Sequence, residues 1–194
     1  ADALGVATHM GDLDDVAALV ERTVARFGGI DIVVNNAANA LTQPLGAFTP
    51  EAWQKSFDVN LRGPVFLVQS ALPHLERSEH ASVVNVISAG AFLFSAGVAM
   101  YAAAKAALMA FTRSMAAEYA ALGVRVNALA PGTVDTDMVR ASPPEAQAAM
   151  ARASAQARAA HPDEMVGPVV FLASSASSFM TGQVLYLDGG YTSC

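Results

Sequence analysis

Short runs of β-branched and apolar residues alternate along this chain with longer segments of helical periodicity, and this alternation restricts the possible folds more than any other feature. Strands joined by crossover helices form a parallel sheet that is covered by helices on both faces. We therefore expect an α/β fold with three layers, α/β/α, around a doubly wound parallel sheet. The predicted strands are residues 4–8, 30–34, 83–87, 124–129 and 183–187.

Capping residues predict where the helices begin and end. Asp12 is expected to cap a helix that runs to Phe27, with Asp15 completing a capping box, and Gly28-Gly29 is expected to end it. Thr49 and Pro50 predict the start of a helix that continues towards His74, with a bend near Gly63-Pro64. Further helices are predicted over residues 100–121, over residues 143–160 and after Pro162.

The composition limits the class of protein. A chain of 194 residues, 54% hydrophobic and 14% charged, fits a single compact domain. A net charge of -6 without a basic run argues against nucleic acid or an anionic membrane as a partner. The single cysteine, Cys194, excludes an intrachain disulfide, and no secretory signal is visible at the N-terminus, so we expect a cytoplasmic protein.

The segment Ala81–Ala104 contains no charged residue and is long enough to span a membrane. It opens with a β-branched run and is interrupted by Gly90 and Gly97. These features favour a buried strand, a loop and the start of a helix over a membrane span.

Tyr101 and Lys105 stand four residues apart in a predicted helix, thirteen residues after Ser88. Residues i and i+4 share one helix face, so the Lys105 ammonium can approach the Tyr101 phenol and favour the phenolate. This arrangement suggests proton and hydride chemistry. Two alternatives remain open: Tyr101 is a half-buried core aromatic, or Ser88 satisfies backbone groups at a strand end.

Taken together, the motifs make the chain resemble the short-chain dehydrogenases/reductases, a Rossmann-type family of nicotinamide-dependent oxidoreductases. The resemblance extends essentially from residue 1 to the end. It rests on landmarks that occur in the family's order and spacing: Asn35-Asn36-Ala37, Val59-Asn60-Leu61, Ser88, Tyr101-x-x-x-Lys105, Arg125-Val126-Asn127, Pro131-Gly132 with Thr136, Thr181-Gly182-Gln183 and Asp188-Gly189-Gly190.

The resemblance implies a catalytic set of four residues. Tyr101 would be the general acid in ketone reduction and the base in alcohol oxidation, and Ser88 would hydrogen-bond the substrate oxygen. Lys105 would lower the pKa of Tyr101 and bind the nicotinamide ribose. Asn60 would hold a water in a proton relay.

The resemblance also implies a site for NAD or NADP, with the choice between them left open, and a mobile substrate lid over residues 138–160. The small, apolar residues of the lid suggest a hydrophobic carbonyl or alcohol substrate. The four histidines show no metal-ligand spacing, so no metal is expected. The implied cofactor-binding residues are His9, Asn35, Ala37, Tyr101, Lys105, Pro131, Gly132, Thr133 and Thr136, although Asn35 or Asn36 could equally tie strands together.

The chain departs from the family at its N-terminus. No glycine-rich phosphate-binding spacing occurs, and residue 1 corresponds to the family's third strand, so we expect residues 1–194 to be one N-terminally incomplete domain. His9 replaces the usual aspartate that touches adenine, and Ala38 replaces a glycine. The alternative to an active oxidoreductase is a non-catalytic, truncated form that keeps its oligomer surfaces but cannot bind a dinucleotide.

Family members assemble through long helices that correspond here to residues 50–77 and 100–121, and through the C-terminal strand region. The resemblance thus implies a homotetramer or homodimer. A 3-oxoacyl reductase acting on an acyl-carrier protein would need a basic patch for its acidic partner, and this chain has only eleven lysines and arginines.

Overall fold

The computed structural model describes residues 2–93 and 97–193, and Cys194 lies outside this part. Its centre is a sheet of four parallel strands in the order β1-β2-β3-β4, formed by Ile32–Asn35, Ser82–Val86, Arg125–Pro131 and Val184–Leu187. The register pairs Val33 with Val83, Val83 with Val126, and Leu129 with Leu185. Each strand was predicted from its apolar run, and parallel pairing confirms the α/β class.

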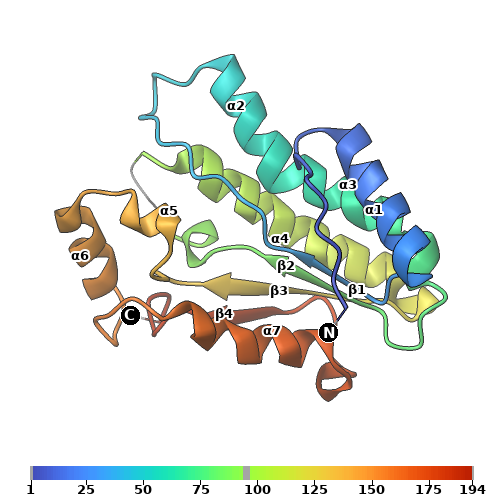
Figure 1. Cartoon of the computed structure of the whole chain (residues 1–194). Coiled ribbons are helices and arrows are strands. Elements are labelled where there is room, and N and C mark those ends of the chain that lie inside the picture. The colour runs from blue at the N-terminus through green and yellow to red at the C-terminus, as the bar shows by residue number, and fades with distance from the viewer. Residues whose placement is uncertain (1, 94–96, 194) are drawn as a thin grey trace.

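Helices cover both faces of the sheet (Figure 1). Helices α1 (Leu13–Phe27), α3 (Gly63–Leu75) and α4 (Ala99–Tyr119) lie on one face, and α7 (Val166–Ala173) lies on the other. Helix α2 (Pro50–Phe57) continues the layer of α3, while α5 (Asp137–Arg140) and α6 (Pro144–Arg152) lie beyond the carboxyl end of β3. Five short helical turns complete the described chain: η1 Asp58–Arg62, η2 Ala89–Ala91, η3 Ala120–Leu122, η4 Pro162–Met165 and η5 Ser175–Ser177.

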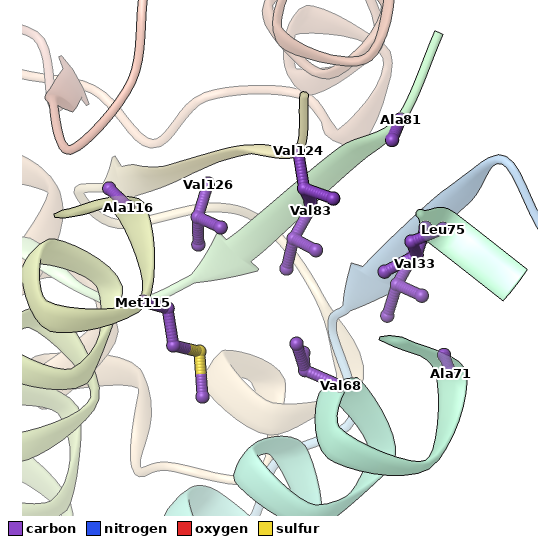
Figure 2. Close-up of a cluster of buried hydrophobic side chains, with 10 residues drawn as sticks. All are labelled: Val33, Val68, Ala71, Leu75, Ala81, Val83, Met115, Ala116, Val124 and Val126. Carbon is purple, nitrogen blue, oxygen red and sulfur yellow. The ribbon is translucent and has the colours of Figure 1, made fainter. Parts of the chain in front are cut away.

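The main core fills the space between the sheet and helices α3 and α4. Figure 2 shows valines from the strands meeting aliphatic side chains of α3 and the Met115 side chain of α4. A second cluster around Leu129 and Leu172 packs α7 against the other face. Both faces of β2 are therefore buried, which is why its sequence is continuously apolar apart from Ser82 and Asn85.

The helix ends follow the predicted caps, with one correction at α1. The Asp12 carboxylate accepts from the backbone N–H groups of Asp14 and Asp15, and Gly28 ends the helix with a φ of 86°. Thr49 caps α2 through the N–H of Ala52. The predicted capping box was wrong, because the Asp15 carboxylate accepts from the N–H of His9 at 2.9 Å.

One predicted element is absent from the described structure and another is shorter than predicted. Residues 4–8 form no strand, because β1 pairs only with β2 and no described strand lies beside this segment. The helix predicted over residues 143–160 ends at Arg152. Beyond it, Gln156 donates to the Gly189 carbonyl, and Ala157 adopts a positive φ of 52°, so the backbone serves tertiary contacts instead of a helix.

The uncharged segment contributes β2, η2 and the first part of α4, as the interrupted pattern predicted. Among the described residues, no helix combines the length and apolarity needed to cross a membrane.

Candidate active site

Ser88 lies just beyond the carboxyl end of β2, where the chain leaves the sheet. The preceding residue still donates to the Leu129 carbonyl of β3, and Ser88 itself is extended, with φ -161° and ψ 148°. Its Oγ accepts from the N–H of Gly90 at 3.1 Å and so caps the short turn η2. Since a backbone donor occupies one lone pair, the hydroxyl hydrogen is left to point towards another acceptor.

Tyr101 and Lys105 occupy the face of α4 that looks onto the sheet. Lys105 is only 1% exposed, and its ammonium donates to the carbonyl of Val86 in β2 at 2.8 Å. The same ammonium lies 5.8 Å from the centre of the Tyr101 ring. Tyr101 is half-buried and forms a hydrogen bond with the side chain of Ser88. The structure thus brings these three predicted residues together at one end of β2.

Burial determines the acidity of this group. It raises the pKa of the Tyr101 phenol above 10.0, and the hydrogen bond with Ser88 opposes this rise only in part. Burial also lowers the pKa of Lys105 to about 8. On balance the Tyr101 pKa is raised, because loss of hydration disfavours the phenolate more than the contact with Ser88 favours it. The expectation that the Lys105 charge favours the phenolate stays a prediction.

Asn60 is fully buried in η1, a single π-helical turn between α2 and α3. This extra turn lies at the predicted bend, immediately before Gly63, and π-turns frequently mark functional sites. The Asn60 amide donates to the Asn39 and Ser56 carbonyls, both at 2.9 Å, and its oxygen accepts from the N–H of Asn39 at 3.1 Å. These contacts hold the loop after β1 against the helix layer, while the role of Asn60 in a water relay stays a prediction.

Asn35 is buried at the carboxyl end of β1, where its amide donates to Asn85 Oδ1 of β2 at 2.8 Å and to the Pro64 carbonyl at 3.3 Å. Its side chain therefore ties two strands to α3, which is the alternative that the sequence left open. Ala37 follows β1 on the exposed side of the same strand end. His9 is also exposed, and its Nδ1 accepts from the N–H of Gly11 at 3.2 Å.

Pro131 is the last residue of β3, and Gly132, Thr133 and Thr136 follow it. Gly132 must lack a side chain, because a Cβ there would lie 2.8 Å from Asp188 Cα. The Thr133 hydroxyl donates to the Met150 carbonyl of α6 at 3.2 Å, so it anchors the predicted lid. Thr136 lies half-buried at the start of α5.

Two landmarks of the resemblance have structural tasks that sequence reasoning missed. Arg125 donates to the Leu172 and Ser174 carbonyls and to Ser177, all between 2.7 and 3.1 Å, and so closes the end of α7. Asn127 donates to the Met180 carbonyl at 2.7 Å and accepts from the N–H of Gln183 at 3.0 Å, which positions β4. Arg125 and Asn127 flank Val126 in β3, so both side chains point to the same face of the sheet. This alternation was the sequence signal that one face of β3 makes buried polar contacts.

Comparison with known proteins decides the family. A family model described as enoyl-(acyl carrier protein) reductase matches residues 2–192. Cis-4-hydroxycyclohexanecarboxylate dehydrogenase of Sinomonas cyclohexanicum is 41% identical over 191 residues, which are 98% of this chain and 77% of the relative. The chain belongs to the short-chain dehydrogenase/reductase family.

Other members of the family extend the comparison. The 3-oxoacyl-[acyl-carrier-protein] reductase of Thermotoga maritima is 35% identical over 182 residues, covering 94% of this chain and 74% of that one. A gluconate 5-dehydrogenase from Burkholderia cenocepacia, solved with NADP and tartrate, superposes with a TM-score of 0.90 at 35% identity, over 95% of this chain and 73% of its own. The chain is thus an NAD(P)-dependent short-chain oxidoreductase that acts on CH–OH and C=O groups.

The described residues fit the nicotinamide end of such a cofactor. The buried Lys105 ammonium and the Tyr101 hydroxyl lie at the carboxyl ends of the strands, where open parallel sheets bind dinucleotides. No group of three or more metal-binding side chains occurs among the described residues.

Proposed function

We propose that this short-chain dehydrogenase/reductase interconverts a ketone and a secondary alcohol, with Tyr101 as the general acid and base. The observation that carries the proposal is the convergence of two hydroxyl groups, those of Ser88 and Tyr101, beside a buried ammonium. Two donors aimed at one point stabilise the negative charge that develops on a carbonyl oxygen during reduction.

In the direction of reduction, Tyr101 starts with its proton, because burial raises the pKa of its phenol. Ser88 donates a hydrogen bond to the substrate oxygen, and Tyr101 transfers its proton to that oxygen. The positive charge of Lys105 then stabilises the phenolate that remains. When bound, the nicotinamide cofactor supplies or accepts the hydride. In alcohol oxidation the same groups act in reverse, with the Tyr101 phenolate as the base.

The groups proposed to hold the nicotinamide half are Tyr101, Lys105, Pro131, Gly132, Thr133 and Thr136, while His9, Ala37 and the backbone at Asn35 would face the adenosine half. Asn60 is proposed to support the proton relay from its buried position in η1. The choice between NAD and NADP stays open.

The lid supports a small, hydrophobic substrate. Helices α5 and α6 border an open groove of about 560 Å³ whose walls include Val139, Pro144, Ala148 and Ala151. The groove is also lined by Asp135, Arg158 and His161, and Arg158 is engaged by two contacts of 2.8 Å to Glu164. With Arg158 paired in this way, the groove offers little attraction for an acidic acyl-carrier protein, so we favour a free alcohol or ketone.

Exposed apolar side chains support a homotetramer or homodimer. Phe66 of α3 and Phe111 of α4 are exposed, and so are Val166 and Val170 of α7. Exposed apolar groups on a folded chain mark interaction surfaces when they gather in patches. We propose that the helical segments over residues 50–77 and 100–121, together with the region of α7 and β4, form the subunit contacts.

One observation supports the alternative of a non-catalytic, truncated form. The outer edge of β1 has no partner strand among the described residues, and its Ile32 and Val34 are 45% and 41% exposed. An open strand edge of this kind supports a chain that keeps its subunit surfaces without binding a dinucleotide.

Cofactor titration separates the two readings. The purified chain is titrated with NADH and NADPH, following reduced-cofactor fluorescence and the thermal unfolding midpoint. Saturable binding, followed by turnover of a cyclic or aliphatic ketone that is lost in Tyr101→Phe, supports the oxidoreductase. Binding with full turnover in Tyr101→Phe would contradict the proposed role of Tyr101, and no binding would favour the rival.

A further inference from the structure

A fully buried polar pair, Asn85 of β2 and Thr112 of α4, lies beneath the candidate active site. The Asn85 amide donates to the Thr112 hydroxyl oxygen at 2.9 Å, and that hydroxyl donates to the Leu108 carbonyl at 2.8 Å. The Asn85 carbonyl oxygen accepts from the Asn35 amide of β1 at 2.8 Å. Both side chains are thus engaged in hydrogen bonds in the buried interior.

The pair lies on the same stripe of α4 as the proposed proton-transfer residues. Tyr101, Lys105, Leu108 and Thr112 follow one another at intervals of four, three and four residues, which places all of them on one helix face. Thr112 comes two turns after Lys105, about 10 Å further along the axis.

Two residues of this stripe, Lys105 and Thr112, are attached to neighbouring residues of one strand. The Lys105 ammonium donates to the carbonyl of Val86, and Thr112 accepts from the side chain of the adjacent Asn85. A helix that is held by one hydrogen bond can still rotate or shift along an aliphatic sheet surface. Two hydrogen bonds at different points of the helix fix both its rotation and its position along the strand. Aliphatic packing constrains the volume between helix and sheet, but it does not depend on angle as a hydrogen bond does.

We propose that Asn85 and Thr112 are positioning residues that set the register of α4 on β2 and thereby hold Lys105 at the Val86 carbonyl and Tyr101 at Ser88. They touch neither substrate nor cofactor and act through Lys105. The inference deepens the proposed function, and its effect on turnover depends on the acid–base role of Tyr101.

Thr112→Val removes the hydroxyl while nearly keeping the side-chain shape. The Asn85 amide then lacks an acceptor in a dry interior, which favours a shift of α4 or the entry of water. Either change hydrates Lys105 and moves the Tyr101 hydroxyl away from its position. Because small displacements of catalytic groups are expensive, kcat should fall roughly ten- to hundredfold while KM changes little.

The test uses the fact that the chain contains two lysines, Lys55 and Lys105. Lysine labelled with ¹³C at Cε gives two signals whose pH titration is followed by NMR without cofactor, and Lys55→Arg assigns them. Tyr101 is the titratable side chain that the structure shows against Lys105, so its own ionisation is followed in the same series.

Thr112→Val is compared with Thr112→Ser, which keeps the hydroxyl, and with Ser82→Ala. Ser82 is a matched control because it is also fully buried on β2, but its hydroxyl donates to the Leu172 carbonyl at 2.9 Å, on the α7 side. Ser82→Ala should lower the unfolding midpoint without moving the Lys105 titration or kcat.

We expect the Lys105 pKa to rise from about 8 towards 10.5 in Thr112→Val and to stay at the wild-type value in Thr112→Ser. An unchanged Lys105 titration in Thr112→Val, or an equal change in Ser82→Ala, would overturn the proposal. If Thr112→Val does not fold, Thr112→Ala is judged by the same measurements. A moved titration in a chain whose wild type shows no turnover would support the positioning role and reject the proposed function.

Discussion

Replacing Lys105 by methionine should abolish a rise in the free energy of unfolding between pH 8 and pH 10, because the buried ammonium opposes folding until it loses its proton. The pKa of Lys105 falls from 10.5 to about 8 on folding, through loss of hydration. Between these two values the unfolded chain binds more protons than the folded one, so the free energy of unfolding rises with pH in this window. Each pKa unit corresponds to about 1.4 kcal/mol, which gives a gain of about 2–3 kcal/mol between pH 7 and pH 10 for the wild type.

Lys105→Met removes this gain, since methionine has no proton to release. At pH 7 it relieves the burial of the charge but leaves the Val86 carbonyl without its donor, at a cost of about 1–3 kcal/mol, so the absolute stability should change little. The informative quantity is therefore the pH dependence of the difference between the two proteins.

Urea unfolding followed by circular dichroism at pH 7, 8, 9 and 10 measures this difference. Lys55→Met is the matched control, because Lys55 is exposed on α2 and its removal should leave the pH dependence unchanged. The ionisation of Tyr101 is common to all three proteins and belongs to higher pH, since its pKa is raised. A difference between wild type and Lys105→Met that stays constant from pH 7 to pH 10 would refute the desolvation of Lys105.

Two further substitutions test close contacts by thermal and urea unfolding. Gly63→Ala should destabilise the fold by about 3 kcal/mol or more, because the new Cβ would lie 1.9 Å from the Met10 carbonyl oxygen, whereas Gly29→Ala meets nothing within 4 Å and should be nearly neutral. Arg125→Ala should cost about 2–4 kcal/mol by leaving the end of α7 and the Ser177 side chain without their donor, and Arg125→Lys should recover only part of this loss; equal stability of Arg125→Ala and wild type would exclude the capping role.

Local patterns sufficed for the four described strands, most helix ends and the shared helix face of Tyr101 and Lys105. Each of the four described strands is an apolar run, and Thr49 and Gly28 cap helices through contacts within a few residues of themselves. The spacing of Tyr101 and Lys105 carries over directly, because a helix places residues i and i+4 on one face.

Features that depend on distant parts of the chain could not be predicted in this way. Residues 4–8 have the composition of a strand, but a strand exists only where a partner edge is available. Residues 153–160 have helical composition, but their backbone groups are taken by Thr133 and Gly189. The Tyr101 pKa depends on how completely the folded chain excludes water from the phenol. The spacing of Tyr101 and Lys105 in the sequence gives no information about this.

The close approach of Gly132 to Asp188 joins two segments that are remote in the sequence. Asp188 holds its own turn through the Thr192 hydroxyl at 2.7 Å and the Thr192 N–H at 2.9 Å, so its backbone cannot retreat without breaking these bonds. Position 132 can therefore accept a larger residue only in a lineage where the turn at 188 has already moved. We therefore expect positions 132 and 188 to change together during evolution. A chimaera that takes these two positions from different parents should fold poorly even when each parent is stable.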